Sequence, residues 1–152
     1  MLPDTNRRVA QQTNEDVNRQ IREQTRKNIA KYANASAEEI TLRLNELDSE
    51  WDIERTLEAN AATLALGGLL LGATVDRKWF IFPGVIATFL LQHSLQGWCP
   101  PIPIFRRLGI RTSAEINEER YALKEIRGDF DRVGQKSQGN ANLQEAITAS
   151  RQ

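Results

Sequence analysis

The chain has 152 residues, equal numbers of acidic and basic side chains and a formal net charge of zero. A neutral chain has no overall positive field, so this composition argues against a nucleic-acid partner. The single cysteine, Cys99, excludes an internal disulfide and a multi-cysteine metal site. We expect no cofactor, and the sequence identifies no small-molecule substrate.

The sequence of the N-terminal third predicts that this part of the chain forms polar helices. Residues 1–12 have no apolar period and are predicted to be disordered. Thr13 and Asp16 indicate a first helix that reaches about residue 33, and Ser36 with Glu39 forms a capping box for a second. We expect residues 13–58 to form a cytoplasmic helical arm. Its apolar stripes are Val17, Ile21, Ile29 and Tyr32 in the first helix, and Ile40, Leu44, Leu47 and Trp51 in the second.

The second helix of this arm is followed by no proline and no evident cap before Val75. We therefore predict that residues 37–75 form one long helix or two nearly collinear helices. Their stripe passes from charged into wholly uncharged sequence.

Two uncharged segments, 59–75 and 79–95, are joined by the short loop 76–78. Each would extend about 26 Å as a helix, close to the thickness of a bilayer core. The alternative is a buried helical pair in a soluble protein, but the polar arms offer little apolar surface to cover it. We predict an all-α membrane protein in which residues 59–96 form a two-helix transmembrane hairpin, with amphipathic arms at both ends.

The sequence after the second span is rich in proline, and residues 97–111 are predicted to lie non-helically at the membrane interface. Aromatic residues at both ends of the span are candidate interfacial anchors: Trp79, Trp98 and Phe105. A final amphipathic helix is predicted over 112–133, starting at Thr112 or Ser113 with Glu115. Its apolar positions are Ile116, Leu123, Ile126 and Phe130, and a flexible tail is predicted for 134–152.

Basic residues predict the topology. The outer flanks carry Arg55, Arg106, Arg107 and Arg111, whereas the loop carries only Arg77 and Lys78. Because cytoplasmic flanks carry more basic residues, and because the N-terminus shows no signal peptide, we expect a multi-pass protein with both termini in the cytoplasm.

Two short motifs suggest a family. Gly97-x-Cys99-Pro100 follows the second span, and Leu108-Gly109-x-x-Thr112 lies shortly beyond. This combination resembles the YgaP-like inner-membrane transmembrane domain family of bacteria. The resemblance implies a two-helix hairpin in the bacterial inner membrane and homo-association. No rhodanese domain precedes the hairpin here, so the resemblance implies topology more than sulfur transfer.

A row of small residues marks the first span: Ala61, Ala65, Gly68 and Gly72. Such a face lets two helix backbones approach closely in lipid. It could pack on the second span of the same chain, through Gly84, or it could form a contact between subunits.

Charged residues flank the membrane segments on one side. Glu54 and Glu58 precede the first span, and Arg106, Arg107 and Arg111 follow the second. We predict a juxtamembrane clasp between these carboxylates and arginines; the alternative is that each side chain extends separately to water.

His93 and Cys99 are the two candidates for chemistry. His93 is an ionisable residue at membrane depth, and Cys99 is a juxtamembrane thiol that could be acylated or carry sulfur. A hydrogen-bonded histidine and a structural cysteine are the simpler interpretations. We expect a non-catalytic assembly protein, either a homo-oligomer or a subunit of a larger membrane complex, with the bilayer as its environment. The alternatives are a sulfur or redox carrier that uses Cys99 and a small channel or transporter subunit.

Overall fold

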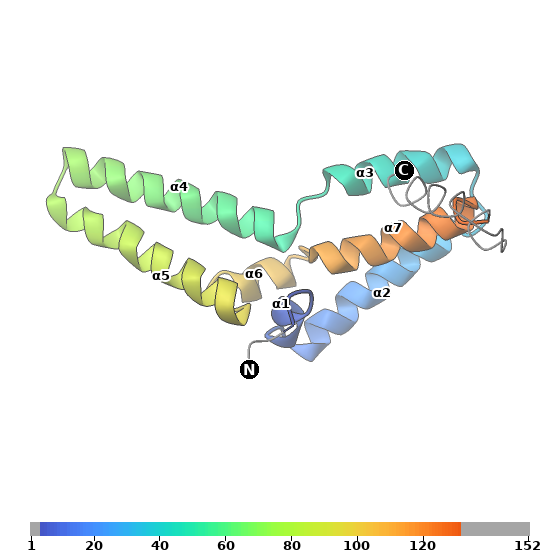
Figure 1. Cartoon of the computed structure of the whole chain (residues 1–152), viewed down its shortest axis with the longest axis horizontal. Helices are drawn as coiled ribbons and strands as arrows, with labels where there is room; N and C mark the ends of the chain where they lie inside the picture. Colours follow the sequence, from blue (N-terminus) through green and yellow to red (C-terminus); the bar gives the residue numbers. More distant parts are fainter. Residues whose placement is uncertain (1–3, 132–152) are drawn as a thin grey trace, which may run out of the picture. The chain divides into compact units, whose positions relative to one another are not determined.

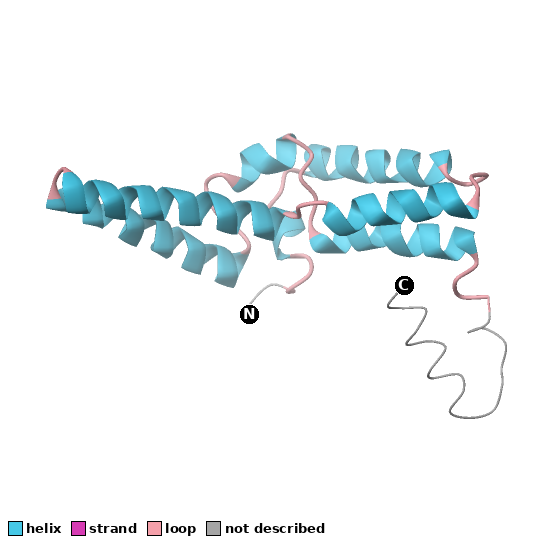
Figure 2. Cartoon of the chain, turned by 90° about the horizontal axis from the view of Figure 1, so that it is seen from above, coloured by secondary structure: helices cyan, strands magenta, loops and turns pink. Residues whose placement is uncertain are grey.

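The computed structural model describes residues 4–131, and every regular element in this range is a helix (Figure 1, Figure 2). The all-α prediction is therefore confirmed for this part of the chain. The predicted tail, 134–152, lies outside the described residues. The fold divides into two compact units, residues 4–23 with 51–116 and residues 24–50 with 117–131.

The N-terminal segment differs from the predicted disorder. A short helix, α1 (Arg8–Gln11), follows a turn in which the Arg8 N–H donates to the Asp4 carbonyl at 2.8 Å. Val9 is only 3% exposed because it packs in a cluster with Ile53, Leu57, Cys99 and Ile102. This partner surface comes from residues more than 40 positions away, so local composition could not reveal it.

The next two helices start at side-chain caps. In α2 (Glu15–Lys31), Asn14 rather than Thr13 acts as the cap, because its side-chain oxygen accepts from the Asp16 N–H at 2.8 Å. In α3 (Ala37–Ser49), Ser36 and Glu39 form the predicted capping box. Both helices therefore begin close to the predicted positions.

The chain breaks between α3 and the next helix, α4 (Ile53–Thr74). Glu50 and Asp52 have extended backbone angles, and the Asp52 side chain accepts from the Arg55 N–H at 2.8 Å. Residues 37–75 are therefore two helices and not one. Asp52 is thus the N-cap that separates the two helices, although no cap was predicted between residues 37 and 75.

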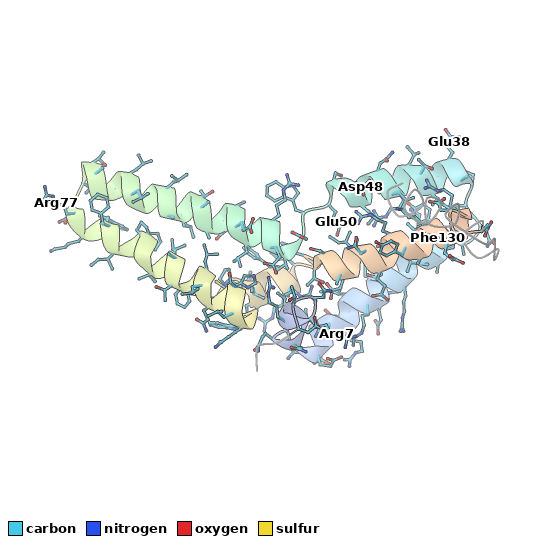
Figure 3. The ribbon with its side chains drawn as sticks, in the orientation of Figure 1. Arg7, Glu38, Asp48, Glu50, Arg77 and Phe130 are labelled. Atoms are coloured by element: carbon cyan, nitrogen blue, oxygen red, sulfur yellow. The ribbon has the colours of Figure 1, made fainter. Side chains whose placement is uncertain are left out.

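Two antiparallel helices, α4 and α5 (Ile81–Gln96), contact each other and lie closest near the turn that joins them (Figure 1). They are linked by a 3-10 turn, η1 (Arg77–Phe80), which includes the labelled Arg77 (Figure 3). The first helix therefore starts six residues earlier than the uncharged segment at 59. Trp79 belongs to the connecting turn rather than to the second helix.

The proline-rich segment contains a helix, contrary to the expectation of non-helical structure for 97–111. The helix α6 (Ile102–Arg107) has Pro101 at its N-cap and Pro103 within its first turn. Prolines are tolerated there because the first N–H groups of a helix have no partner inside it. The final helix, α7 (Ser113–Arg127), ends earlier than the predicted bound of 133, because Gly128, which follows it, has a left-handed φ of 86°.

In the unit formed by residues 24–50 and 117–131, a charged group lies at the centre of three helical segments. Glu119 is 0% exposed and accepts hydrogen bonds from Arg43 Nε at 2.9 Å and from Asn28 Nδ2 at 3.1 Å. These bonds connect α7 with α3 and with the C-terminal part of α2. Apolar side chains complete this core: Ile40, Leu44, Leu47 and Leu123 are buried, whereas Trp51, the last residue of the predicted stripe, is half exposed.

Candidate functional site

The first candidate site is a polar cluster where α1, α4 and α5 meet. Glu54 Oε2 lies 2.6 Å from His93 Nε2, and Glu54 Oε1 lies 2.8 Å from Arg8 Nη2. The contact with His93 lowers the pKa of Glu54, and Arg8 adds to this effect against the opposing effect of burial. An ionised Glu54 requires the proton of this hydrogen bond to sit on His93 Nε2. The cluster therefore anchors the N-terminal segment to the paired helices.

The backbone of α1 also approaches α5 very closely, at Gly97. This residue ends α5 with a left-handed φ of 76°, and its N–H donates to the His93 carbonyl at 2.7 Å. A Cβ at Gly97 would lie 2.5 Å from the carbonyl carbon of Arg8. Only glycine satisfies both the backbone angle and this contact.

The second cluster surrounds Arg106 on α6, whose side chain is fully buried. Its guanidinium donates to both oxygens of Glu115, at 2.6 and 2.7 Å, and to Asn18 Oδ1 at 3.0 Å. Burial raises the pKa of Glu115, but hydrogen bonds from Arg106 and Thr112 outweigh this and lower it overall. This bidentate pair connects the N-terminal part of α2, α6 and the start of α7.

The start of α4 is tied to the segment before α7. The Ile53 N–H donates to the Arg111 carbonyl at 2.8 Å, and the Ser113 hydroxyl donates to the Asp52 carboxylate. At the same point Thr112 and Glu115 form a capping box. The ends of the apolar helices are thus held by several hydrogen bonds from neighbouring elements.

The small face of α4 packs inside the chain. A Cβ at Gly68 would lie 2.8 Å from Pro83 Cδ, and one at Gly72 would lie 2.7 Å from the Phe80 ring. Ala61 is buried on the same side and Ala65 is half-buried. Gly84, the expected partner on the second span, instead has no neighbour within 4 Å of its Cβ position. The side chains of Phe80 and Phe82, and not Gly84, therefore contact the small face of α4.

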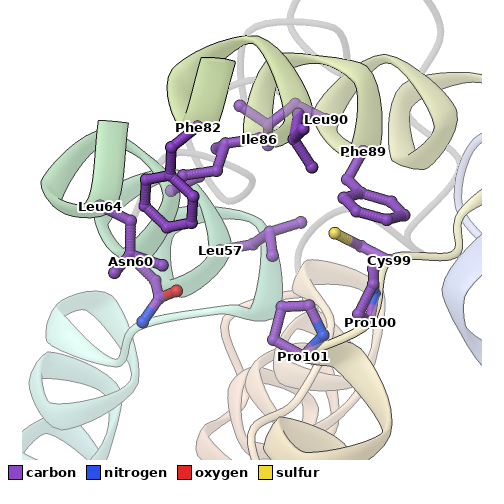
Figure 4. Close-up of a pocket in the computed structure, with 12 residues that line it drawn as sticks. Leu57, Asn60, Leu64, Phe82, Ile86, Phe89, Leu90, Cys99, Pro100 and Pro101 are labelled. Carbon is purple, nitrogen blue, oxygen red and sulfur yellow. The ribbon is translucent and has the colours of Figure 1, made fainter. Parts of the chain in front are cut away.

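The two helices leave an apolar pocket of about 210 Å³ between them, near α6 (Figure 4). Leu57, Phe89 and Leu90 line it together with the Cys99 thiol. Cys99 is 5% exposed, and burial raises the pKa of its thiol. A buried thiol with a raised pKa has less of the reactive thiolate, so these surroundings suit a structural cysteine better than a carrier.

Large apolar side chains are exposed along the outer surface of the α4–α5 pair. They are Leu64, Leu66, Leu69, Leu70, Leu71, Val75, Trp79, Phe80, Ile81, Phe82, Val85, Leu91 and Leu95. Within the described residues one stretch, Ala37–Thr74, which comprises α3 and α4, is long and apolar enough to cross a membrane by length and composition, and only 22% of its apolar window is buried. The core helix of a soluble protein would be mostly buried. The pair therefore exposes far more apolar surface than an isolated soluble protein usually does.

The remaining predicted site residues are distributed as follows. Of the predicted clasp residues, Glu54 and Arg106 belong to the two different clusters above and pair with other partners: Arg8 and His93 for Glu54, and Glu115 for Arg106. Glu58 and Arg107 are exposed and Arg111 is buried. Among the predicted anchors, Trp79 is 43% exposed, Trp98 is half-buried and Phe105 packs against the Val9 cluster. Within residues 4–131, no group of three or more His, Cys, Asp or Glu side chains could hold a metal ion.

Sequence reasoning missed Arg8, Asn18 and the pairing role of Glu115. Arg8 and Asn18 carry no local signal, because each meets its partner across a long stretch of chain. Glu115 could have been found from its place in a capping box after Thr112. Trp51 was also missed as a surface residue: the Arg55 guanidinium lies 4.4 Å from the centre of its ring, and the indole is half exposed.

In comparisons with known protein families, characterised proteins and solved structures, no match to this chain is found.

Proposed function

We propose that this chain is a two-pass membrane protein with a structural role, in which α4 and α5 cross the bilayer as a hairpin and the polar helices assemble at one surface. The observation that carries this proposal is the exposed apolar surface on α4, η1 and α5. Each helix satisfies its own backbone hydrogen bonds, as lipid requires. The two helices therefore contact each other only through their side chains.

The lengths of the elements suit this placement. The uncharged part of α4, residues 59–74, extends about 24 Å, at the short end for the roughly 30 Å of a hydrocarbon core. The 16 residues of α5 extend only about 24 Å, and Trp79 and Phe80 of the preceding 3-10 turn add about 4 Å. Trp79 and Phe80 would then lie near the far interface, with Arg77 and Lys78 in water.

The role that we propose is assembly, either as a homo-oligomer or as an accessory subunit. The polar and motif residues support it, because each has a visible packing function. Gly97 accommodates α1, Cys99 fills the core, Thr112 caps α7, and His93 bonds Glu54. The resemblance to the YgaP-like family, bacterial inner-membrane localisation and cytoplasmic termini remain parts of this proposal.

Membrane insertion is tested by fractionation. The wild-type chain should remain in the membrane pellet after alkaline carbonate washing and should be released by mild detergent. Leu70→Arg should reduce insertion, because an arginine near the bilayer centre costs about 2.5–3.5 kcal/mol on insertion scales. Leu42→Arg, at an exposed position of α3, is the matched control. A monodisperse, detergent-free soluble monomer would refute the proposal.

Topology is tested in a Cys99→Ala background. A cysteine placed at Lys78 should react with a membrane-impermeant reagent on intact cells, whereas one placed at Ser49 should react only after lysis. The opposite pattern would reverse the orientation.

Assembly is tested by native mass in mild detergent and by cross-linking. Because Gly68 packs against Pro83, Gly68→Ile should disrupt the helix pair itself. Gly84→Ile occupies open space and should weaken only a contact with another chain through α5. A wild type that is monomeric at native expression would exclude the homo-oligomer and favour an accessory subunit.

A further inference from the structure

We propose that the pocket between α4 and α5 binds one acyl chain of a membrane lipid, an inference that rests on the membrane placement proposed above. The pocket lies where the two helices diverge toward α6 (Figure 4). Its walls include Leu57, Leu64, Ile86, Phe89 and Leu90, with Cys99 and two prolines at one end.

The chemistry of the walls selects hydrocarbon. No charged side chain lines the pocket, and its polar groups are the Asn60 amide and the Cys99 thiol. A buried water needs two to four polar partners, which these walls do not provide. An apolar cavity of about 150 Å³ already holds a benzene-sized molecule, so the volume of about 210 Å³ accommodates a somewhat larger apolar group.

The helices cannot simply close over this space. Toward the connecting turn, Gly68 and Gly72 already make close contact with Pro83 and Phe80. At the other end, Glu54 is bonded to His93 at 2.6 Å. Fixed at both ends, the pair keeps a gap opposite the short side chain of Ala61. Filling a gap of this kind restores dispersion contacts that its walls otherwise lack.

The surroundings favour an acyl chain over other apolar ligands. Several pocket residues, among them Leu64, Phe82 and Val85, are also exposed on the outer apolar surface, so the pocket is continuous with the surface that would face lipid. Asn60 is exposed and is the second residue of the uncharged stretch 59–75. In a membrane-spanning α4 this amide would lie near the depth of the lipid ester carbonyls, to which its N–H groups can donate.

The test uses the full chain in phosphatidylcholine vesicles that contain a phosphatidylcholine with a photoreactive diazirine near the end of one acyl chain. After illumination, adducts are mapped by mass spectrometry. We expect adducts at pocket residues such as Leu57 and Phe89 as well as at the outward-facing Leu70. Ala61→Phe should reduce the pocket adducts at least fivefold and leave those at Leu70 unchanged. Ala62→Phe, at an exposed neighbouring position, is the matched control and should change neither.

Leu64→Trp provides a second filling variant, because Leu64 is half exposed and a larger ring there does not have to fit wholly inside. Helical content by circular dichroism verifies that each variant folds. Adducts at Leu70 without pocket adducts, or pocket adducts unaffected by both filling variants, would overturn the lipid site but not the membrane placement. Absence of adducts at every position would instead refute the membrane placement.

Discussion

Gly97→Ala is expected to detach the N-terminal segment from the paired helices. The substitution meets two separate obstacles: a left-handed backbone angle, and the Arg8 backbone at 2.5 Å from the new Cβ. Because a backbone atom cannot swing aside as a flexible side chain would, α1 must move. Gly109 has a similar φ of 85° but nothing within 4 Å of its Cβ position. Gly109→Ala therefore meets only the first obstacle and is the matched control.

The two variants should differ by the cost of displacing α1. A left-handed angle costs a non-glycine residue about 1–2 kcal/mol. Moving α1 would expose Val9, which is 3% exposed, and this loses about 1.5–3 kcal/mol of apolar burial. We therefore expect Gly109→Ala to lower the free energy of unfolding by about 1–2 kcal/mol and Gly97→Ala by about 2.5–5 kcal/mol.

The free energy of unfolding of each variant is measured on the full chain in mild detergent, by denaturant titration followed by circular dichroism. Hydrogen exchange at residues 8–12 reports directly on whether α1 remains docked. Gly97→Ala should accelerate exchange there and Gly109→Ala should not. Equal destabilisation by the two variants, with residues 8–12 still protected in both, would refute the proposed contact between Arg8 and Gly97.

Three further predictions follow from the polar clusters and the thiol. Arg106→Met should lower the free energy of unfolding by about 3–5 kcal/mol, because it leaves the half-buried Glu115 carboxylate without its cation; pairing it with Glu115→Leu in a double-mutant cycle should recover part of this loss, and strict additivity would contradict a direct interaction. Glu54 and Glu115 have folded-state pKa values below their ordinary 4.5, so their stabilisation is full above that pH and is lost as the pH falls through the lowered values. The Gln variants of both residues should accordingly flatten the acid side of the stability profile, and an unchanged acid profile would count against these contacts. Since burial raises the pKa of Cys99, we expect alkylation at pH 7 to be about tenfold slower or more than at a cysteine placed at exposed Ser49, and comparable rates would show an accessible thiol.

The features that the sequence predicted well are those controlled by neighbours within a turn. Ser36 and Glu39 cap α3 as expected, and the predicted start of the last helix is correct because Thr112 and Glu115 satisfy each other's backbone N–H groups. The uncharged segments were visible for the same reason, since composition is a local property. Even so, one local signal was overlooked: Asp52 separates α3 from α4 by accepting from the Arg55 N–H.

The partners of the buried polar groups were decided only by tertiary structure. Glu54 has basic residues near it in sequence, yet it bonds Arg8 and His93, which are 46 and 39 positions away. Arg106 reaches Asn18 across 88 positions. A charged side chain that is removed from water needs a hydrogen-bonding partner within about 3 Å. The packing of the helices decides which residue that is, and sequence spacing does not predict it. Tertiary structure also decides the contact of Gly68. This residue packs against Pro83 of its own chain because the turn at Arg77–Phe80 returns the backbone alongside α4.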